Sequence, residues 1–545
     1  MRTGTFELNS RFSTKFSNQL LGTITKINTD KSRPGAAFPF VDILGSPAGA
    51  KNNYISFGNE PFNGNNNKVV NDVYTITDNV TYYSGKHTIT AGGSYEYQRV
   101  GNMFMAGSQG YYVYGNTAEF YANAAPRLFS LTYSLVPGED AVYSANLKIG
   151  QLGLYAQDEI NVNPNFKLTA GLRVDRPIYL EQPLENPAIT ALTLRDIDGK
   201  NENYTTGAWP KATWLLSPRV GFRWDVNADK RLIIRGGTGV FTGRIPFVFL
   251  TNIPSNSGMY QYGTLLTNTA DLANIRLNAD PHAYNPFYNT TLSPALFPTK
   301  AGTAVPSGAY ALTANDFKFP QVWRTNLAVE KQMGSGWNLN LEAIYTKDIN
   351  AVYMFNANQG NPDTLVTLGQ TTRPRYSSTA ARKINAASGN AIVLDNTSKG
   401  SSFSLTAQLS KNFNRHFYGS VAYTFTYASD VTANPGSQAN SVWSVNPTSN
   451  TQNTVELAYS NFAVPHRVIA TLSYRAEYLK HLGTTVSLFY EGAHAGNYSY
   501  IYNGDINNDG NSADLMYIPR DASEIKFRDG VVINGVTYSA KQQSD

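Results

Sequence analysis

Apolar and polar residues alternate at every second position through many short stretches of this chain. The clearest example joins residues 468–475 to residues 484–491 through a short link. A strand with one apolar and one polar face, repeated many times along a chain, is the sequence pattern of a transmembrane β-barrel. The pattern therefore predicts an all-β protein whose antiparallel strands cross an outer membrane.

Seven such strand pairs are predicted along the chain, with short links inside each pair. The predicted pairs are residues 3–11 with 19–27, 72–82 with 86–97, 151–160 with 166–175, 217–226 with 230–241, 320–331 with 337–345, 403–411 with 417–427, and 468–475 with 484–491. The links within pairs carry turn residues, for example Ser84-Gly85 and Asn227-Ala-Asp229. The chain is therefore expected to supply about 14 strands.

The links between pairs are long, so short and long links alternate along the chain. The long links include residues 176–216, 242–319, 346–402 and 428–465. Antiparallel strands place alternate links at opposite ends of a sheet, and outer-membrane barrels have short periplasmic turns and long extracellular loops. In immunoglobulin-like and propeller proteins, nothing confines the long links to every second position. The alternation favours a membrane barrel with long extracellular loops over a soluble β-protein.

Charged residues occupy only one face of the predicted strands. In the strand after Ser217, the apolar set is Val220, Phe222 and Trp224, and the charged set is Arg219, Arg223 and Asp225. A charge on the lipid face costs about 2–4 kcal/mol at mid-bilayer. We therefore expect a lumen-facing set made of Arg219, Arg223, Asp225, Arg235 and Arg324. Its arginines form either a basic track for an anionic solute or, as we favour, ion pairs with carboxylates such as Asp225 and Glu330 or contacts to a plug.

Composition excludes several other classes of protein. Of 545 residues only 15% are charged and 12% are aromatic, whereas soluble domains carry about 25% charged residues. The absence of cysteine excludes disulfides and thiolate metal sites. A net charge of +5 without a basic block gives no argument for nucleic acid. No apolar run reaches the roughly 18 residues of a transmembrane helix, and residues 1–8 do not resemble a signal peptide.

Several stretches go beyond a generic barrel pattern. Residues 154–175 resemble the strand, turn and strand signature of TonB-dependent outer-membrane receptors. A second set resembles the Oar-like branch of that family, which is frequent in Bacteroidota: Ser217-Pro-Arg-Val-Gly-Phe-Arg-Trp-Asp225, Arg235-Gly-Gly-Thr-Gly-Val-Phe-Thr-Gly-Arg-Ile-Pro-Phe247, Phe319-Pro-Gln-Val-Trp-Arg-Thr-Asn-Leu327, Val464-Pro-His-Arg467 and Leu515-Met-Tyr-Ile-Pro-Arg-Asp521. The resemblance runs in order over nearly the whole chain.

The resemblance implies a barrel of about 22 strands around a plug domain, coupled to the TonB complex through a TonB box. It also implies that the extracellular loops capture a ligand, with a surface lipoprotein as one partner to expect. We recognise no plug, TonB box or signal in residues 1–545. We therefore expect a partial barrel domain that lacks about a third of the strands and does not transport alone, because open strand edges are not tolerated in lipid.

One loop carries a spacing typical of calcium ligands. Its oxygen-bearing side chains are Asp505, Asn507, Asp509, Asn511 and Asp514, with Gly510 at the bend. Ca²⁺ takes about six to eight oxygen ligands, and alternate spacing folds such ligands around one point. The twelfth position is Met516, where an EF-hand has a bidentate glutamate. The loop is therefore either a calcium site or an Asx- and Gly-rich turn, and its place in the chain puts it outside the cell.

No other motif points to chemistry. No His-Glu-x-x-His or Gly-x-Ser-x-Gly motif occurs, so we expect no enzyme activity and no cofactor other than calcium. Tyrosine-rich loop stretches at residues 111–114 and 259–262 suit adaptable contacts to peptide or glycan surfaces, and a similar composition is also found in ordinary outer-membrane loops. Two alternatives to a transporter remain, namely an outer-membrane adhesin or structural barrel, and a soluble secreted β-protein that binds glycans.

Overall fold

A large antiparallel sheet dominates the computed structural model, which describes residues 1–31, 35–45, 53–533 and 535–544. The fourteen strands of the main path, in spatial order, are β1 (Arg2–Arg11), β2 (Phe16–Asp30), β5 (Asn67–Ser84), β6 (His87–Phe104), β9 (Ala145–Asn163), β10 (Phe166–Tyr179), β13 (Leu215–Asp225), β14 (Leu232–Thr242), β17 (Gln321–Gly334), β18 (Trp337–Asp348), β23 (Ser401–Asn412), β24 (Phe417–Asp430), β26 (His466–Tyr478) and β27 (Leu482–Ala493). A short strand, β25 (Ala458–Tyr459), pairs with β24. All seven predicted pairs are confirmed.

The register of the sheet separates an apolar face from a polar face. Trp224 lies opposite Ile234, and the same row continues through Val329 and Leu341. The neighbouring row, on the other face, contains Arg223, Arg235 and Glu342. Trp224 is 41% exposed although it is apolar. An exposed apolar face this continuous is the lipid-facing side of a membrane barrel, so the polar face lines the inside.

Aromatic side chains mark both ends of the apolar face. Tyr345, Phe403 and Tyr427 lie in one cross-strand row near the ends of their strands. At the opposite end, the rings of Phe417 and Tyr474 lie 4.8 Å apart between centroids. Two such rows are the interfacial girdles of a membrane barrel, where a ring has one apolar and one wet neighbour.

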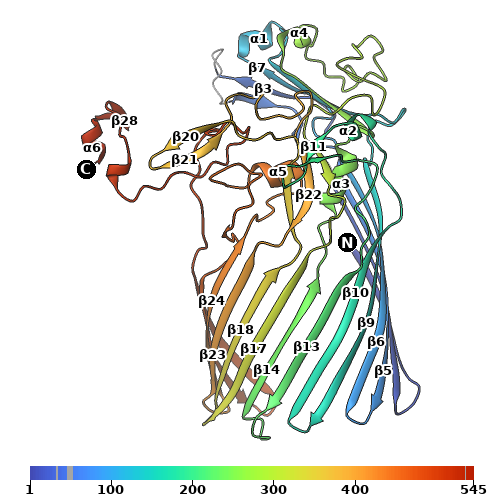
Figure 1. Ribbon diagram of the computed structural model, residues 1–545, viewed down its shortest axis with the longest axis vertical. Helices are drawn as coiled ribbons and strands as arrows, with labels where there is room; N and C mark the ends of the chain where they lie inside the picture. The colour runs from blue at the N-terminus through green and yellow to red at the C-terminus, as the bar shows by residue number, and fades with distance from the viewer. Residues whose placement is uncertain (32–34, 46–52, 534, 545) are drawn as a thin grey trace.

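Short and long links separate to opposite ends of the sheet, as the sequence predicts (Figure 1). At the end with the long links, three strands run farther than predicted: β5 begins at Asn67, β6 ends at Phe104 and β9 begins at Ala145. Most of the added residues of β6 and β9 are buried, with Leu147 and Ile149 only 1% and 2% exposed, and those of β5 are half-buried. These strands therefore continue beyond the bilayer and pack against the long links.

The long links fold into an ordered layer, which we call the cap. It contains the sheet β15-β8-β7-β3-β4 and the sheet β16-β22-β19. The strands of these two sheets are β3 (Phe40–Leu44), β4 (Asn53–Phe57), β7 (Tyr111–Tyr114), β8 (Leu128–Ser134), β15 (Gln261–Leu266), β16 (Tyr310–Thr313), β19 (Ala351–Asn356) and β22 (Ala391–Thr397). The helices are α1 (Thr117–Tyr121), α2 (Pro187–Thr190), α3 (Val248–Ser255), α4 (Thr269–Leu272) and α5 (Ala439–Ser444). Figure 1 shows β3, β7, β22 and α3 at the long-link end of the barrel strands.

Smaller elements complete the described chain. Three further two-stranded sheets lie in the long links or after the last barrel strand. They are β11 (Leu194–Arg195) with β12 (Asn201–Glu202), β20 (Thr364–Leu368) with β21 (Thr371–Arg375), and β28 (Val531–Ile533) with β29 (Val536–Tyr538). The 3-10 helix η1 (Ala522–Glu524) and α6 (Ala540–Ser544) follow the last barrel strand. Among the helices of the described ranges, none has both the length and the apolar run that a membrane crossing requires.

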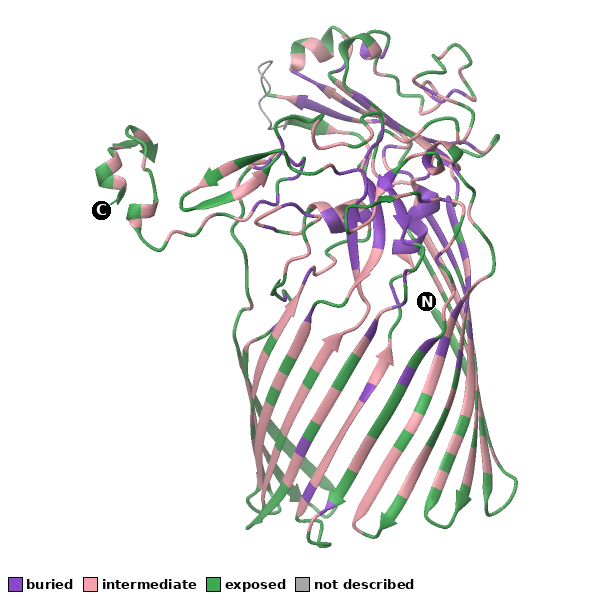
Figure 2. Ribbon diagram, viewed as in Figure 1, coloured by how far each residue is buried: buried purple, intermediate pink, exposed green. Residues whose placement is uncertain are grey.

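The hydrophobic core lies mainly in the cap (Figure 2). One cluster of buried residues includes Phe249 and Trp443 from α3 and α5, and a second includes Tyr112 and Phe129. Tyr112 and Tyr114 are 2% and 0% exposed. The prediction that residues 111–114 form a contact loop is therefore wrong for these two side chains, because alternate residues of β7 point into the cap core.

Candidate functional site

The polar inner face of the sheet carries an ion-pair cluster centred on Arg235. Its Nε lies 2.7 Å from Glu330 Oε1, and its Nη1 lies 3.3 Å from Glu342 Oε1. Glu330 comes from the adjacent strand β17 and Glu342 from β18, the next strand along the sheet. One guanidinium is thus matched by two carboxylates on a half-exposed surface. This is the pairing that the sequence favours over an unpaired basic track.

The other predicted lumen charges share this face but do not join the cluster. Arg219 stacks over the ring of Phe241, with its guanidinium carbon 4.6 Å from the ring centroid. Arg324 donates from Nε to Thr346 Oγ1 at 3.1 Å. Asp225 accepts the backbone N–H of Lys230 at 3.0 and 3.1 Å, so it closes a turn and does not pair with an arginine as expected. Turn geometry decides this, because Asp225 is the last residue of β13.

Buried asparagines tie separate long links of the cap together. Asn356 is 4% exposed, and its Oδ1 accepts the backbone N–H groups of Asn358 and Ala391, each at 3.0 Å. Its own backbone N–H donates to Asn453 Oδ1 at 2.8 Å, across 97 positions of chain. An amide offers two donors and two acceptor lone pairs, so one side chain can satisfy several buried backbone groups. The loops are therefore held by specific hydrogen bonds as well as by apolar packing.

The loop from Asp505 to Asp514 folds around its own acidic side chains. Asp505 accepts the N–H of Asp509 at 3.0 Å and that of Gly510 at 2.8 Å. Asp514 Oδ2 accepts the N–H of Ile506 at 2.8 Å. Asn508 and Gly510 have φ angles of 63° and 95°, the left-handed conformation that lets the chain reverse sharply. The alternate spacing thus produces a compact loop with its oxygens turned inward.

This loop is buried against the cap, on the side of the long links. Asn507 donates to the carbonyl oxygen of Asn450 at 2.7 Å, and Asn511 donates to Gln452 Oε1 at 3.1 Å. Burial raises the pKa of Asp509 to about 6, with a further rise from the nearby carboxylates of Asp505 and Asp514. Burial also raises the pKa of Asp514. Burial and neighbouring carboxylates thus disfavour the ionised form of these carboxyl groups, and a bound cation would stabilise that form.

Metal coordination is not formed in the loop as it stands. Across the described part of the chain, no three acidic or histidine side chains lie close enough together to hold a metal ion. The carboxylates of Asp505 and Asp514 instead accept backbone N–H groups. Calcium coordination would therefore require some of these oxygens to turn, together with the amide oxygens of Asn507 and Asn511.

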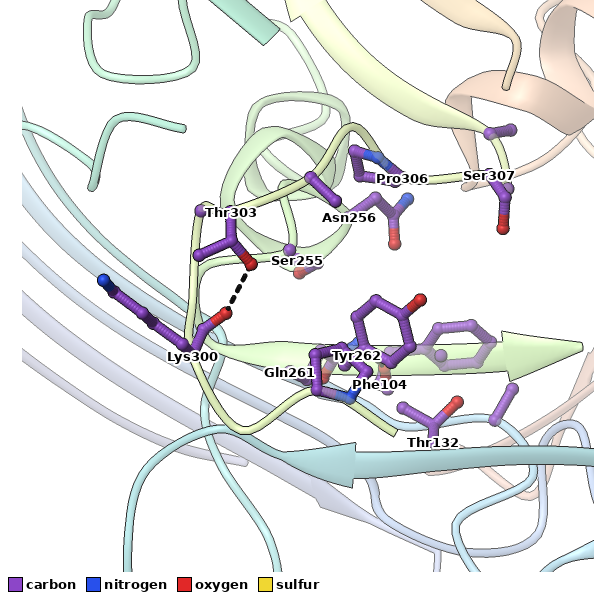
Figure 3. A pocket seen from close by; sticks show the side chains of 18 residues that line it. Phe104, Thr132, Ser255, Asn256, Gln261, Tyr262, Lys300, Thr303, Pro306 and Ser307 are labelled. Atoms are coloured by element: carbon purple, nitrogen blue, oxygen red, sulfur yellow. Dashed lines mark hydrogen bonds between the residues drawn. The ribbon is translucent and has the colours of Figure 1, made fainter. Parts of the chain in front are cut away.

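A cavity in the cap was not predicted from the sequence (Figure 3). Its volume is about 180 Å³, and its walls come from the ends of β6 and α3, from β8 and β15, and from residues 298–309. Gln261 and Tyr262 are among the residues that line it. They belong to the tyrosine-rich stretch 259–262, which is the one sequence signal for this site. The other walls come from residues far away in the sequence, so only the folded cap brings them together.

The polar groups in the cavity are neutral side chains. Gln261 is 8% exposed and donates from Nε2 to the carbonyl oxygen of Phe104 at 2.9 Å. Its Oε1 atom is buried and has no hydrogen-bond partner. Thr132 and Ser255 also contribute to the lining. The charged group of Lys300 points away from Gln261 and Tyr262, while its backbone carbonyl accepts a hydrogen bond from Thr303 (Figure 3).

Sequence comparison identifies one family. Residues 2–499 match the family described as the outer membrane beta barrel domain. Among curated protein sequences, none matches the chain.

Solved structures with a similar course of the chain include three outer-membrane proteins. The outer membrane transporter YddB from Escherichia coli is 12% identical, with 94% of this chain and 53% of that chain covered and a TM-score of 0.49. The FrpB iron transporter from Neisseria meningitidis is 11% identical, with 87% of this chain and 49% of that chain covered and a TM-score of 0.43. A mutant of the ferric enterobactin receptor PfeA from Pseudomonas aeruginosa is 11% identical, with 90% of this chain and 48% of that chain covered and a TM-score of 0.43. The chain spans about half the length of these proteins.

Proposed function

The chain belongs to the outer membrane beta barrel domain family, and from this premise we propose that it is part of a TonB-dependent transporter that takes up an extracellular ligand. Its place is the outer membrane of a Gram-negative bacterium. The exposed apolar band on the sheet agrees with that location and excludes a soluble secreted β-protein. The Oar-like sequence stretches support assignment to that branch of the transporters.

The observation that carries the proposal is the combination of a polar, charged inner face with a folded cap. Arg235 and its two carboxylate partners face the inside of the sheet, where water or a solute can reach them. The cap is a layer with its own hydrophobic core and is fixed to the barrel strands, for example by Asn102, which donates to Thr251 at 3.2 Å. A rigid scaffold that presents loops above a polar interior suits ligand capture followed by passage.

We further propose that additional strands and a plug domain complete this barrel in the working protein. Within the described residues, β1 pairs only with β2, and β27 pairs only with β26. Their other edges carry backbone N–H and C=O groups that the hydrocarbon core cannot satisfy, so each edge requires a further strand. The charged groups of the inner face would contact the plug.

The test is a pull-down from native outer membranes with the purified periplasmic domain of TonB as bait. Recovery of the complete protein supports the proposal. Its absence from the eluate, when another TonB-dependent receptor from the same membranes is recovered, overturns the proposal and favours an adhesin or structural barrel. A surface lipoprotein that co-purifies with the complex would identify the expected extracellular partner.

A second proposal concerns the loop from Asp505 to Asp514, which we propose binds Ca²⁺ and orders the adjoining part of the cap. Its support is the inward arrangement of the oxygens and the raised pKa of the buried Asp509. Asp505, Asn507, Asp509, Asn511 and Asp514 would supply the ligands, with no role in catalysis. A calorimetric titration with CaCl₂ that gives no heat, in protein first treated with a chelator, would exclude the site.

A further inference from the structure

We propose that the lipid-facing side of β1, β2, β5 and β6 binds one phosphorylated lipid of the outer leaflet. An acyl chain of this lipid lies in an apolar groove, and its phosphate contacts Lys26 and Arg99. The inference goes beyond the proposed function, because it requires only a barrel in the outer membrane. Uptake and lipid binding can therefore fail separately.

The groove is formed by two adjoining rows of residues across these four strands. The rows are Gly4, Ile24, Tyr74 and Tyr97, followed by Phe6, Gly22, Ile76 and Tyr95. A Cβ atom at Gly4 or Gly22 would have no contact within 4 Å beyond its chain neighbours, so the two glycines leave the floor open. The groove has a volume of about 620 Å³, and glycine inside a strand often marks the close approach of a ligand.

The register of the sheet shows that this groove faces lipid. The inner-face row that contains Arg219 continues across the strands to Thr90 on β6. Tyr95 and Tyr97 lie five and seven positions farther along the same strand. Successive side chains of a strand point to opposite faces, so an odd separation places these two rings on the outer face. Their partners across the strands share that face.

The groove lies near the outer edge of the apolar band. At the short-link end of β5, the ring of Tyr82 lies beside Phe16, with 4.7 Å between centroids. Tyr74 lies eight residues away along the strand. At about 3.3 Å per residue and a tilt of about 40°, this separation places Tyr74 about 20 Å nearer the long-link end. The apolar band of such barrels is about 25 Å tall, so the next row lies among the lipid head groups.

Cationic side chains occupy that next row, on the same outer face. The row consists of Arg2, Lys26, Asp72, Arg99 and Lys148. Lys148 pairs with Glu181. Within the described ranges, by contrast, Lys26 and Arg99 form no ion pair, and both are exposed. The Nζ atom of Lys26 lies 6.0 Å from the centroid of the Tyr74 ring, which belongs to the groove.

These two features match the two parts of a phosphorylated lipid. Phosphate oxygens accept charge-assisted hydrogen bonds from arginine and lysine, and the groove offers an apolar surface to an acyl chain. A zwitterionic head group would bring its own cation against the row of cations. An anionic solute without an acyl chain would leave the groove empty. The combined site therefore favours a lipid with an anionic head group.

The experiment is native mass spectrometry of the complete protein in detergent, with synthetic lipid A that carries two phosphates and with the same lipid without phosphate. We expect the phosphorylated lipid to bind at least about tenfold more tightly. K26Q/R99Q should weaken its binding about ten- to thirtyfold, because each cation near an anionic head group contributes about fivefold. G22L should weaken binding of both lipids at least about fourfold, because leucine fills the floor and denies burial to a methylene group.

Two matched controls make the same kinds of change elsewhere on the outer face. K411Q removes a lysine at the short-link end, where its Nζ lies 4.6 Å from the centroid of the Trp337 ring. A170L adds a leucine at an exposed alanine opposite Val220 on the apolar face. Both should bind the phosphorylated lipid as the wild type does. Heat-modifiable migration on gels confirms that each variant is folded.

Three results would overturn the inference. The first is equal binding of the lipids with and without phosphate. The second is binding that K26Q/R99Q weakens no more than K411Q, or that G22L weakens no more than A170L. The third is a dimer that G22L dissociates, with no lipid bound, because a second copy of the chain would then occupy the groove. Lipid binding without recovery by TonB would retain the inference and reject only the uptake function.

Discussion

Arg235 on β14 and Glu330 on β17 form an ion pair across the inner face of the sheet, with 2.7 Å between Nε and Oε1. Their side chains are 36% and 42% exposed. Ion pairs this accessible to solvent stabilise proteins by about 0–1 kcal/mol. The pair therefore contributes to the distribution of charge on the inner face and adds little to the stability of the barrel.

Replacing Arg235 tests that conclusion. R235Q should lower the free energy of unfolding by no more than about 1 kcal/mol, and the double variant R235Q/E330Q should be no less stable than R235Q alone. Urea titration of the protein reconstituted in lipid vesicles, followed by tryptophan fluorescence, measures both. A loss of several kcal/mol in R235Q would mean that water does not reach the pair and that the inner face is sealed.

The assignment of the two sheet faces predicts a large difference between neighbouring residues of β17. Leu327 lies on the apolar face and is 51% exposed, whereas Asn326 lies in a row of the polar face. L327R should cost about 2–4 kcal/mol in vesicles, because it places a charge near mid-bilayer. N326R should cost less than about 1 kcal/mol. Equal costs for the two variants would contradict the assignment.

The asparagine network of the cap predicts a local loss of order. N356A leaves the N–H groups of Asn358 and Ala391 without their acceptor, at about 1–3 kcal/mol for each buried donor. Hydrogen exchange should therefore become faster in β22, while the central residues of β14 and β17 remain protected. N278A, at an exposed Asx turn of the cap, serves as the control and should change stability by less than about 0.5 kcal/mol. Uniform acceleration through the barrel would show that cap and barrel unfold together.

The raised pKa of Asp509 predicts a pH dependence of the loop. Its ordinary pKa is 3.8, and burial raises the pKa in the folded loop to about 6. Between these values the folded state holds a proton that the unfolded state has lost, so stability falls as pH rises from about 4 to about 6 and then levels off. Hydrogen exchange of residues 505–514 should follow this course without Ca²⁺, and D509N should reduce the dependence to the part that comes from Asp514, whose pKa burial also raises. A flat profile in the wild type would contradict the burial of this carboxyl.

Ca²⁺ should protect residues 505–514 from hydrogen exchange mainly above about pH 6. Because Ca²⁺ binds the ionised carboxylate, protection by CaCl₂ should be weak near pH 5 and strong near pH 7.5. D509N should reduce the protection, whereas D280N, at an exposed turn of the cap, should not. Protection that is equal at both pH values, or unchanged in D509N, would exclude Asp509 as a ligand.

Strand order, strand pairing and the two faces of the sheet could be predicted from the sequence because each depends on neighbouring residues. Alternation along β13 fixes which side Trp224 and Arg223 take, and a one-residue shift would place every charge in lipid. The length of each link then fixes the end of the sheet at which it lies. The residues expected to bind calcium were selected by the same local reasoning; the structure places them in one loop, and their binding of Ca²⁺ stays a prediction.

The cap and its cavity could not be predicted in this way. Gln261 donates to Phe104 across 157 positions, and Asn356 accepts a hydrogen bond from a residue 35 positions away while donating one across 97. Such contacts have no period along the chain, because irregular links satisfy their backbone groups wherever packing brings a partner. The sequence by itself thus determined a membrane β-sheet with long loops on one side. Only the tertiary structure decided that those loops pack into a cap, since that packing depends on apolar and amide side chains from links far apart in the chain.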